Sequence, residues 1–176
     1  MRLVHFRNYR DECVHFDDGI QLICGSNAQG KTNLLEALYF CSTMRSHRTA
    51  QDRDLIQKEE SSFLIDLSLY RRGRSEQLRV YVNDKGKNLF LHGNPIRRVS
   101  DFIGEVNAVL FCPDDMNLFT ASPRMRRRFI DIELSKLSRR YTQTLGRFQK
   151  LLRERNALLK QKVPDEVYLR VLSEQM

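Results

Sequence analysis

Residues 25–32 read Gly25-Ser26-Asn27-Ala28-Gln29-Gly30-Lys31-Thr32, which fits the phosphate-loop pattern G-x-x-x-x-G-K-[ST] in full. The two glycines permit backbone torsion angles that bring several N–H groups close to one phosphate. A helix beginning near Lys31 would direct the positive end of its dipole at that phosphate. Lys31 adds a positive charge for the β and γ oxygens, and the Thr32 hydroxyl is placed to bind Mg²⁺. The stretch therefore predicts a site for a nucleotide and Mg²⁺.

The sequence on either side of the loop supports this interpretation. Ile20–Cys24 is a short apolar run typical of a buried strand, and Leu34, Leu35 and Leu38 follow at helical spacing. The alternative is a structural strand–helix turn with an exposed lysine. The pattern does not name the reaction, because ATPases, GTPases and small-molecule kinases all use it.

The first two-thirds of the chain also predict further strands. Leu3–Phe6 and Cys13–Phe16 are strand-like, and Asn107–Cys112 is a candidate buried strand that ends at Pro113. Between Ser62 and Arg98 the apolar period is two, interrupted by turn clusters. This stretch predicts an antiparallel meander.

The last third of the chain is predicted to be helical from Met125 onward. Val163-Pro164-Asp165 ends the long helix, and Pro164 suits the first turn of another. An apolar stripe with spacings of three, four and seven favours packing against a core or a second helix. Its members are Leu137, Tyr141, Leu145, Phe148, Leu152 and Leu159.

Positive charge is concentrated in one segment. The chain of 176 residues has a net charge of +8, and residues 121–162 hold thirteen Lys or Arg against three acidic residues, a net of +10. Such a segment favours a polyanionic partner such as nucleic acid. The alternative is a solvated helix face whose partner is an acidic segment from the C-terminal part of the protein.

The remaining composition predicts a cytoplasmic protein. The longest uncharged run, about residues 19–30, is too short and too polar to span a membrane. Charges near the start, including Arg2 and Arg7, argue against a secretory leader. The four cysteines form no C-x-x-C pair, and Cys24 and Cys112 are expected to be reduced core residues.

Five blocks of the chain, in order and in register, resemble the start of the RecF family, within the SMC-like branch of the ABC-type ATPases. The resemblance extends over nearly the whole chain, which makes it far more specific than one phosphate loop. The blocks are Phe6-Arg7-Asn8-Tyr9, residues 25–37, Arg45-Ser46-His47-Arg48-Thr49, Phe111-Cys112-Pro113-Asp114-Asp115, and residues 122–131 with their core of Arg126-Arg127-Arg128-Phe129-Ile130-Asp131.

The resemblance implies an α/β fold with two lobes. Residues 1–112 would form a P-loop ABC-type ATPase head, with a mixed sheet and an antiparallel meander. Residues 113–176 would form a basic, incomplete helical lobe. The resemblance further implies an ATP-dependent DNA-binding protein of gap repair and recombination, connected with DNA replication and the SOS response. Such a protein forms a dimer around two ATP molecules and acts with RecO and RecR to help load RecA on single-stranded DNA.

The chain departs from the family pattern toward its C-terminal end. Neither a Ser-x-Gly-Gln-like signature motif nor a Walker B strand ending in acidic residues precedes Met176. Cys112-Pro113-Asp114-Asp115 is the nearest match, but it corresponds better to the loop joining the lobes, where ABC proteins carry a metal- and water-sensing residue. We therefore expect an N-terminal fragment that binds nucleotide, hydrolyses it poorly and contains no catalytic residue of its own.

The candidate nucleotide site combines the phosphate loop with the polar residues of the first block. Arg7, Asn8 and Tyr9 would reach the base or ribose, or they form an ordinary polar connection. Arg45, His47 and Arg48 would face the γ-phosphate side or DNA, or they form a basic helix end. The predicted cofactor-binding residues are Gly25, Ser26, Asn27, Ala28, Gln29, Gly30, Lys31, Thr32, Asn33, Arg7 and Asn8, with Thr32 as the Mg²⁺ ligand.

The candidate DNA site lies in the basic segment. A row of arginines neutralises phosphates without reading bases, so binding would be sequence-tolerant and salt-sensitive, on single-stranded or gapped duplex DNA. The predicted DNA-binding residues are Arg124, Arg126, Arg127, Arg128, Arg139, Arg140 and Arg147. Two other functions stay open: a P-loop small-molecule kinase, and a non-catalytic assembly module whose helices form a partner interface.

Overall fold

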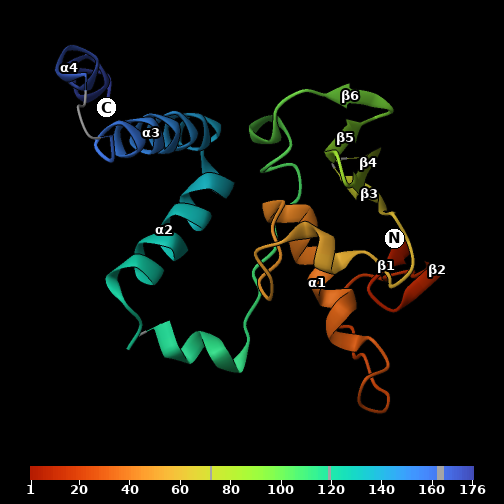
Figure 1. Ribbon diagram of the computed structural model, residues 1–176. Helices are drawn as coiled ribbons and strands as arrows, with labels where there is room; N and C mark the ends of the chain where they lie inside the picture. The colour runs from red at the N-terminus through yellow and green to blue at the C-terminus, as the bar shows by residue number, and fades with distance from the viewer. Residues whose placement is uncertain (72, 119, 162–164) are drawn as a thin grey trace. The chain divides into compact units, whose positions relative to one another are not determined.

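A computed structural model describes residues 1–71, 73–118, 120–161 and 165–176 of the chain (Figure 1). The chain divides into two compact units, Met1–Phe119 and Thr120–Met176. The expected boundary after residue 112 lies slightly before the boundary between these two units. A 3-10 helix, η3 (Pro113–Leu118), follows that expected boundary and lies within the first unit. No described helix is both long and apolar enough to cross a membrane.

The first unit is built on one six-stranded sheet with the order β2-β1-β3-β4-β5-β6. The period-two stretch forms the predicted meander, in which Ile65 pairs with Val80 and Val80 pairs with Leu89. Alternate residues of these strands are buried, as the pattern predicted. The strands are β1 (Arg2–Phe6), β2 (Tyr9–Cys13), β3 (Ser62–Arg71), β4 (Arg74–Asn83), β5 (Gly86–Leu91) and β6 (Asn94–Ile96).

The prediction of a mixed sheet is wrong for the described residues, because every strand pair in them is antiparallel. The two runs predicted as buried strands, Ile20–Cys24 and Asn107–Cys112, form no strand. Ile20 and Val109 are 100% and 92% exposed, and Cys24 is exposed as well. A buried strand needs neighbouring strands that pair its backbone and cover on both faces, and neither run is part of the sheet that the described residues form.

The second strand lies earlier than the sequence predicted. The chain reverses at Arg7 and Asn8, so that Phe6 pairs with Tyr9, and β2 replaces the expected strand at Cys13–Phe16. Arg7 adopts a left-handed conformation with φ of 55° at this turn. Most of β2 is exposed and polar, and this edge strand therefore carries no alternating apolar pattern to reveal it.

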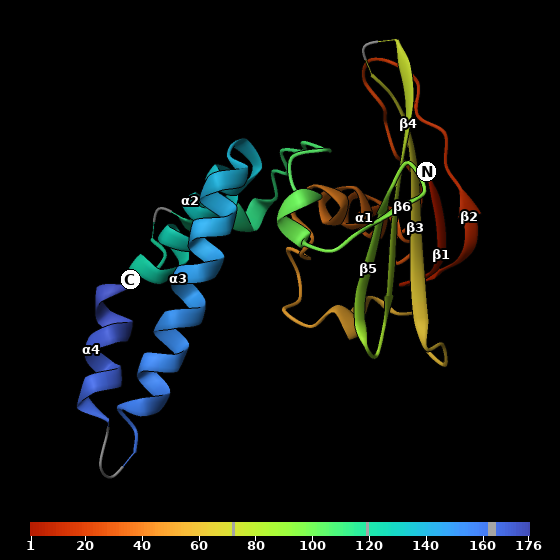
Figure 2. The ribbon, with the colours of Figure 1, turned by 90° about the horizontal axis from the view of Figure 1, so that it is seen from above.

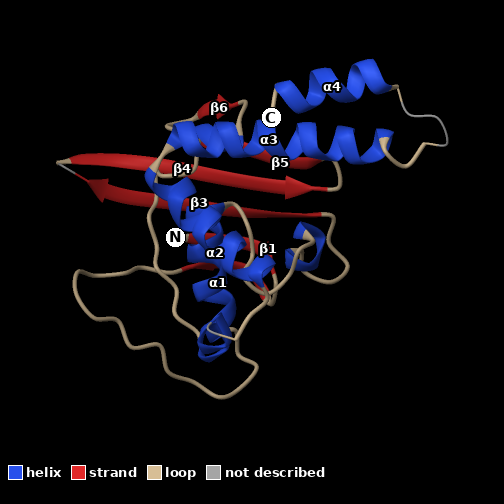
Figure 3. Ribbon diagram, turned by 90° about the vertical axis from the view of Figure 1, so that its left-hand side faces the viewer, coloured by secondary structure: helices blue, strands red, loops and turns tan. Residues whose placement is uncertain are grey.

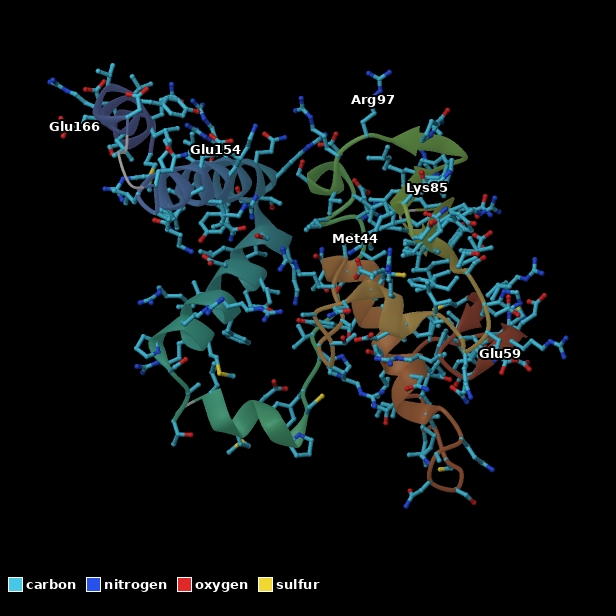
Figure 4. The ribbon with its side chains drawn as sticks, viewed as in Figure 1. Met44, Glu59, Lys85, Arg97, Glu154 and Glu166 are labelled. Atoms are coloured by element: carbon cyan, nitrogen blue, oxygen red, sulfur yellow. The ribbon has the colours of Figure 1, made fainter. Side chains whose placement is uncertain are left out.

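Helix α1 (Lys31–Thr43) covers one face of the sheet (Figure 2). Phe63 of β3 makes edge-to-face contacts with Phe6 of β1 and Phe40 of α1, at centroid distances of 5.2 and 5.8 Å. The helix ends at Met44 (Figure 4), and the Met44 backbone, which is left-handed, donates its N–H to the carbonyl of Phe40. Lys87 of β5 donates to the Met44 carbonyl and pairs with Asp52 at 3.0 Å, which ties the helix end to the sheet.

The connections of the first unit contain two more 3-10 helices, η1 (Asp52–Leu55) and η2 (Val99–Asp101). Leu55 is fully buried in the same core as Phe6, and its carbonyl accepts from the Arg7 N–H at 2.7 Å. The segment after α1 therefore returns to the β1–β2 turn. This contact brings residues far apart in sequence together beside the start of α1.

The second unit consists of α2 (Pro123–Leu137), α3 (Arg139–Leu158) and α4 (Glu166–Glu174). Ser122 and Ser138 cap α2 and α3 by accepting from Met125 and Tyr141 N–H groups, so the single long helix predicted from Met125 is divided at Ser138. Of the predicted break, Val163 and Pro164 lie outside the described residues. Asp165 caps α4.

Helices α3 and α4 lie side by side (Figure 3). Leu151 and Leu172 are buried in this unit, whereas Leu137 and Leu159 of the predicted stripe are 82% and 47% exposed. The stripe was therefore wrong at both ends, and Phe148 within it is exposed as well. The break at Ser138 interrupts the helical period, so Leu137 does not share a face with the positions that follow it, and Leu159 lies just beyond the end of α3.

Replacement of Phe63 tests the sheet–helix core. Phe63→Ala should lower the free energy of unfolding by about 3–5 kcal/mol, because it removes the ring that contacts both Phe6 and Phe40. Tyr70→Ala, at a position of the same strand that is 80% exposed, should change it by less than about 0.5 kcal/mol. Urea titration measures both. Similar losses in the two variants would contradict this account of the core.

Candidate nucleotide-binding site

The phosphate loop has the backbone that its glycines predicted. Gly25 and Gly30 have φ of 151° and 101°, and Gly30 is the left-handed residue that precedes α1. A Cβ on Gly30 would lie 2.5 Å from the side-chain amide of Asn8, so glycine is needed for space as well as for torsion. The backbone of Ala28 is also left-handed, with φ of 66°. The sequence did not predict this conformation, because alanine rarely adopts it.

Hydrogen bonds within the loop hold its two ends together. The Lys31 ammonium donates to the carbonyl oxygens of Gly25 and Ser26, both at 2.7 Å. The Gln29 side-chain oxygen accepts from the Ser26 N–H at 3.2 Å. Lys31 thus lies over the loop, and most of the loop is exposed. An anion there would meet both the ammonium and the start of α1.

Thr32 fits the role of one ligand to Mg²⁺. It is exposed in the first turn of α1, next to Lys31. No cluster of three or more His, Cys, Asp or Glu that could hold a metal exists among the described residues. Beside nucleotides, phosphate oxygens and water commonly supply ligands to Mg²⁺ together with one or two protein side chains.

The β1–β2 turn lies against the loop. Asn8 donates from its side-chain amide to the Gln29 carbonyl at 3.1 Å, and the Tyr9 hydroxyl donates to the Gly30 carbonyl at 3.1 Å. Burial raises the pKa of Tyr9. Asn33 in α1 donates to the Asn8 side-chain oxygen at 2.7 Å. The structure thus brings Asn8, Tyr9 and Asn33 to the loop.

The Arg7 side chain is held elsewhere. Its guanidinium donates to both carboxylate oxygens of Glu36, at 3.0 and 2.8 Å, and to the Asp54 carbonyl at 2.7 Å. These contacts use each of its three nitrogens. Contact of Arg7 with a nucleotide stays a prediction.

Sequence reasoning missed Glu36, which is fully buried on α1. It accepts from Ser46 and Arg7, and Arg48 lies 3.4 Å away. Burial raises the pKa of Glu36, but the hydrogen bonds from Arg7 and Ser46 and the two guanidinium charges outweigh burial and lower it overall. One signal was present in the sequence: Glu36 lies among the apolar residues Leu34, Ala37 and Phe40 of the buried helix face.

The other basic side chains after α1 differ in their surroundings. Arg45 is exposed. His47 packs edge-to-face on Tyr39 at 5.7 Å, and burial lowers its pKa. Arg48 donates to the Asn33 side-chain oxygen at 2.8 Å, and Asn33 and then Asn8 connect it to the Gln29 carbonyl of the loop.

The candidate DNA-binding arginines belong to the second unit and are described within it. Four of them lie in the first two turns of α2 and three in the first half of α3. All seven are exposed, namely Arg124, Arg126, Arg127, Arg128, Arg139, Arg140 and Arg147. Their exposure is compatible with binding to phosphates and equally with a solvated face.

Comparison with known proteins gives the family. The family described as AAA domain matches residues 1–169. The chain belongs to this family. Proteins named DNA replication and repair protein RecF match over its whole length, at 43% identity in Halalkalibacterium halodurans and 41% in Geobacillus thermodenitrificans. The chain covers 48% of each of these relatives, and it spans about half the length of the curated relatives it matches.

Solved structures of RecF agree with the sequence match. A structure titled as the recombination mediator protein RecF-ATP in the RecFOR pathway is 28% identical, with a TM-score of 0.93 over 99% of this chain and 48% of that chain. A second, titled RecF-ATPrS, has a TM-score of 0.90 over 97% of this chain and 47% of that chain. The predicted resemblance to the N-terminal part of RecF and the predicted ATPase-head fold are confirmed.

The buried carboxylate predicts a pH dependence. The pKa of Glu36 is below its ordinary value of 4.5 in the folded protein, so its contribution to stability is present above about pH 4.5 and is lost as pH falls through the folded pKa. Glu36→Gln should destabilise the protein by about 2–4 kcal/mol at pH 7. This loss is somewhat smaller than the loss expected when a fully buried ion pair is broken, because Arg48 is half exposed.

Urea titrations of both proteins between pH 7 and the lowest pH at which the wild type stays folded measure this difference. The gap between wild type and variant should narrow as pH decreases below 4.5. A gap that stays constant over that range would show that the Glu36 charge contributes nothing to stability.

Proposed function

We propose that this chain is the nucleotide-binding part of a RecF-type protein that binds ATP with Mg²⁺ and uses it to control binding to DNA. The observation that carries the proposal is the phosphate loop, whose left-handed glycines and bridging Lys31 lie at the start of α1. The names of the relatives, which refer to DNA replication and repair, and the structure titled RecF-ATP support it. Because the chain spans half of those relatives, the activity is proposed for the whole protein.

Each part of the loop would have a separate task. The N–H groups at the start of α1 would bind a phosphate, and the Lys31 ammonium would exchange the Gly25 and Ser26 carbonyls for β and γ oxygens. Thr32 would hold Mg²⁺, which neutralises charge between those phosphates. Asn8 and Tyr9 would hold the backbone of Gln29 and Gly30 in place through hydrogen bonds to their carbonyl oxygens.

The finer parts of the proposal concern partners and place. An ATP-dependent homodimer and cooperation with RecO and RecR at gaps are proposed from the resemblance to RecF, and a cytoplasmic location is proposed from the composition. The basic second unit supports a DNA partner, because exposed arginines along α2 and α3 present many donors for phosphates. Binding would not depend on sequence, since phosphate contacts carry no base information.

Replacement of Lys31 tests the nucleotide site. Lys31→Ala should remove most affinity for ATP and ADP and leave the melting temperature nearly unchanged, because Lys31 contacts only loop carbonyls among the described residues. Isothermal titration calorimetry measures the affinity. Lys85→Ala, at an exposed turn lysine, is the control and should bind as the wild type does. Unchanged binding by Lys31→Ala would refute the site.

Replacement of the α2 arginines tests the DNA proposal. The triple variant Arg126→Ala, Arg127→Ala, Arg128→Ala should weaken binding to all DNA sequences alike. It should flatten the slope of log K against log salt by up to about three units if each arginine meets a phosphate, since one phosphate contributes about 0.9 on duplex and about 0.7 on single strands.

The control removes the same charge from the first unit. Arg74, Lys85 and Arg97 are exposed, and Arg97 points away from the ribbon (Figure 4). Their triple alanine variant should keep the wild-type slope. Fluorescence anisotropy of labelled gapped DNA, over a salt series with and without ATP, measures both variants in the full-length protein. A wild-type slope for the α2 variant would favour an interface with an acidic protein segment instead.

A further inference from the structure

Glu36 has no place in the proposed contacts with ATP, yet it is a fully buried carboxylate. A buried charge is unfavourable unless it is paired and hydrogen-bonded, and apolar residues of similar volume often stabilise a fold equally well. Stability alone therefore does not explain why a carboxylate lies on the buried face of α1. Its partners, Arg7 at 2.8 Å and Arg48 at 3.4 Å, extend to the phosphate loop by two routes.

The first route is a chain of hydrogen bonds that has a direction. Arg48 lies between Glu36 and Asn33, and it donates to the Asn33 side-chain oxygen at 2.8 Å. Asn33 then presents its amide nitrogen to the Asn8 oxygen at 2.7 Å. Asn8 in turn presents its nitrogen to the Gln29 carbonyl at 3.1 Å. Each amide is oriented by the donor before it, and arginine can only donate.

The second route passes through the backbone of the β1–β2 turn. Arg7 is left-handed, a conformation that is unfavourable for a residue with a side chain. Its guanidinium binds both Glu36 oxygens and the Asp54 carbonyl, which hold the turn in place. Asn8 is the next residue, and its amide fills the space beside Gly30. Both routes therefore meet at Asn8.

We propose that Glu36 is a positioning residue of the nucleotide site. By binding Arg7 and Arg48, it fixes the place and the orientation of the Asn8 amide against the Gln29 carbonyl, and so holds the phosphate loop in the shape that receives phosphates. Glu36 touches no nucleotide in this scheme. The inference rests on the proposed binding of ATP at the loop.

A double-mutant cycle tests the proposal, because a positioning residue and the group it positions are not independent. The dissociation constant of a fluorescent ATP analogue with Mg²⁺ is measured at pH 7 for the full-length wild type, Glu36→Gln, Asn8→Ala and the double variant. Each single variant should bind about three- to tenfold more weakly, the factor expected when one hydrogen bond is lost. The double variant should bind no more than about twofold more weakly than Asn8→Ala.

The matched control is Asp66→Asn. Asp66 is a carboxylate on the sheet that accepts from Arg79 at 2.6 Å and from Gln77 at 3.1 Å, and it makes no hydrogen bond or ion pair with the loop among the described residues. This variant should bind the analogue as the wild type does. Equal weakening in Asp66→Asn and Glu36→Gln would mean a general loss of stability and would overturn the proposal.

If Glu36→Gln fails to fold, as judged by circular dichroism, Arg48→Met replaces it in the cycle, because Arg48 is half exposed and links Glu36 to Asn33. If the double variant lost affinity by the product of the two single-variant factors, or if Glu36→Gln bound the analogue as the wild type does, the positioning role would be overturned. The proposal that ATP binds at the loop would not be affected by either result. A wild-type protein that binds no better than Lys31→Ala would instead refute the nucleotide site, and this inference with it.

Discussion

Helix α1 has to satisfy two demands at once, and the rest of the first unit is arranged around that constraint. Its apolar face must be buried against the sheet, where Phe40 meets Phe63. Its N-terminus must stay at the surface, because the phosphate loop before it is exposed. A helix fixed firmly at its far end meets both demands. Met44 and Lys87 close that end against β5, which leaves the first turn free to face a ligand.

The buried polar cluster gives the helix a second attachment near the loop. Glu36 lies one turn after Thr32, and its partners come from the β1–β2 turn and from the segment after the helix. The same side chains that neutralise the carboxylate therefore gather three parts of the chain beside the loop. Polar contacts of this kind are directional, so they fix geometry in a way that apolar packing alone does not.

The features that the sequence predicted correctly depend on residues that are close to one another in the sequence. Gly25 and Gly30 require unusual torsions at their own positions, and the helix after them follows from the spacing of Leu34, Leu35 and Leu38. The meander follows from alternation within β3 and β4. Glu36 could not be placed in the same way, because Arg7 and Ser46 are 29 and 10 residues away. Ile20–Cys24 and Asn107–Cys112 were misassigned because an apolar run shows only that burial is favourable, whereas a strand also needs a paired neighbour.

Both edges of the sheet discourage a further strand from joining it. At one edge, β2 is exposed and charged, and Asp11 is paired with Arg2 at 2.7 Å. At the other, β6 is three residues long and contains Pro95, which has no N–H to donate. Charged and very short edge strands are two ways in which proteins avoid sheet extension and aggregation. Backbone pairing with another chain is therefore disfavoured at either edge, which leaves the face of the sheet, its loops and helix α1 as the favoured surfaces for association.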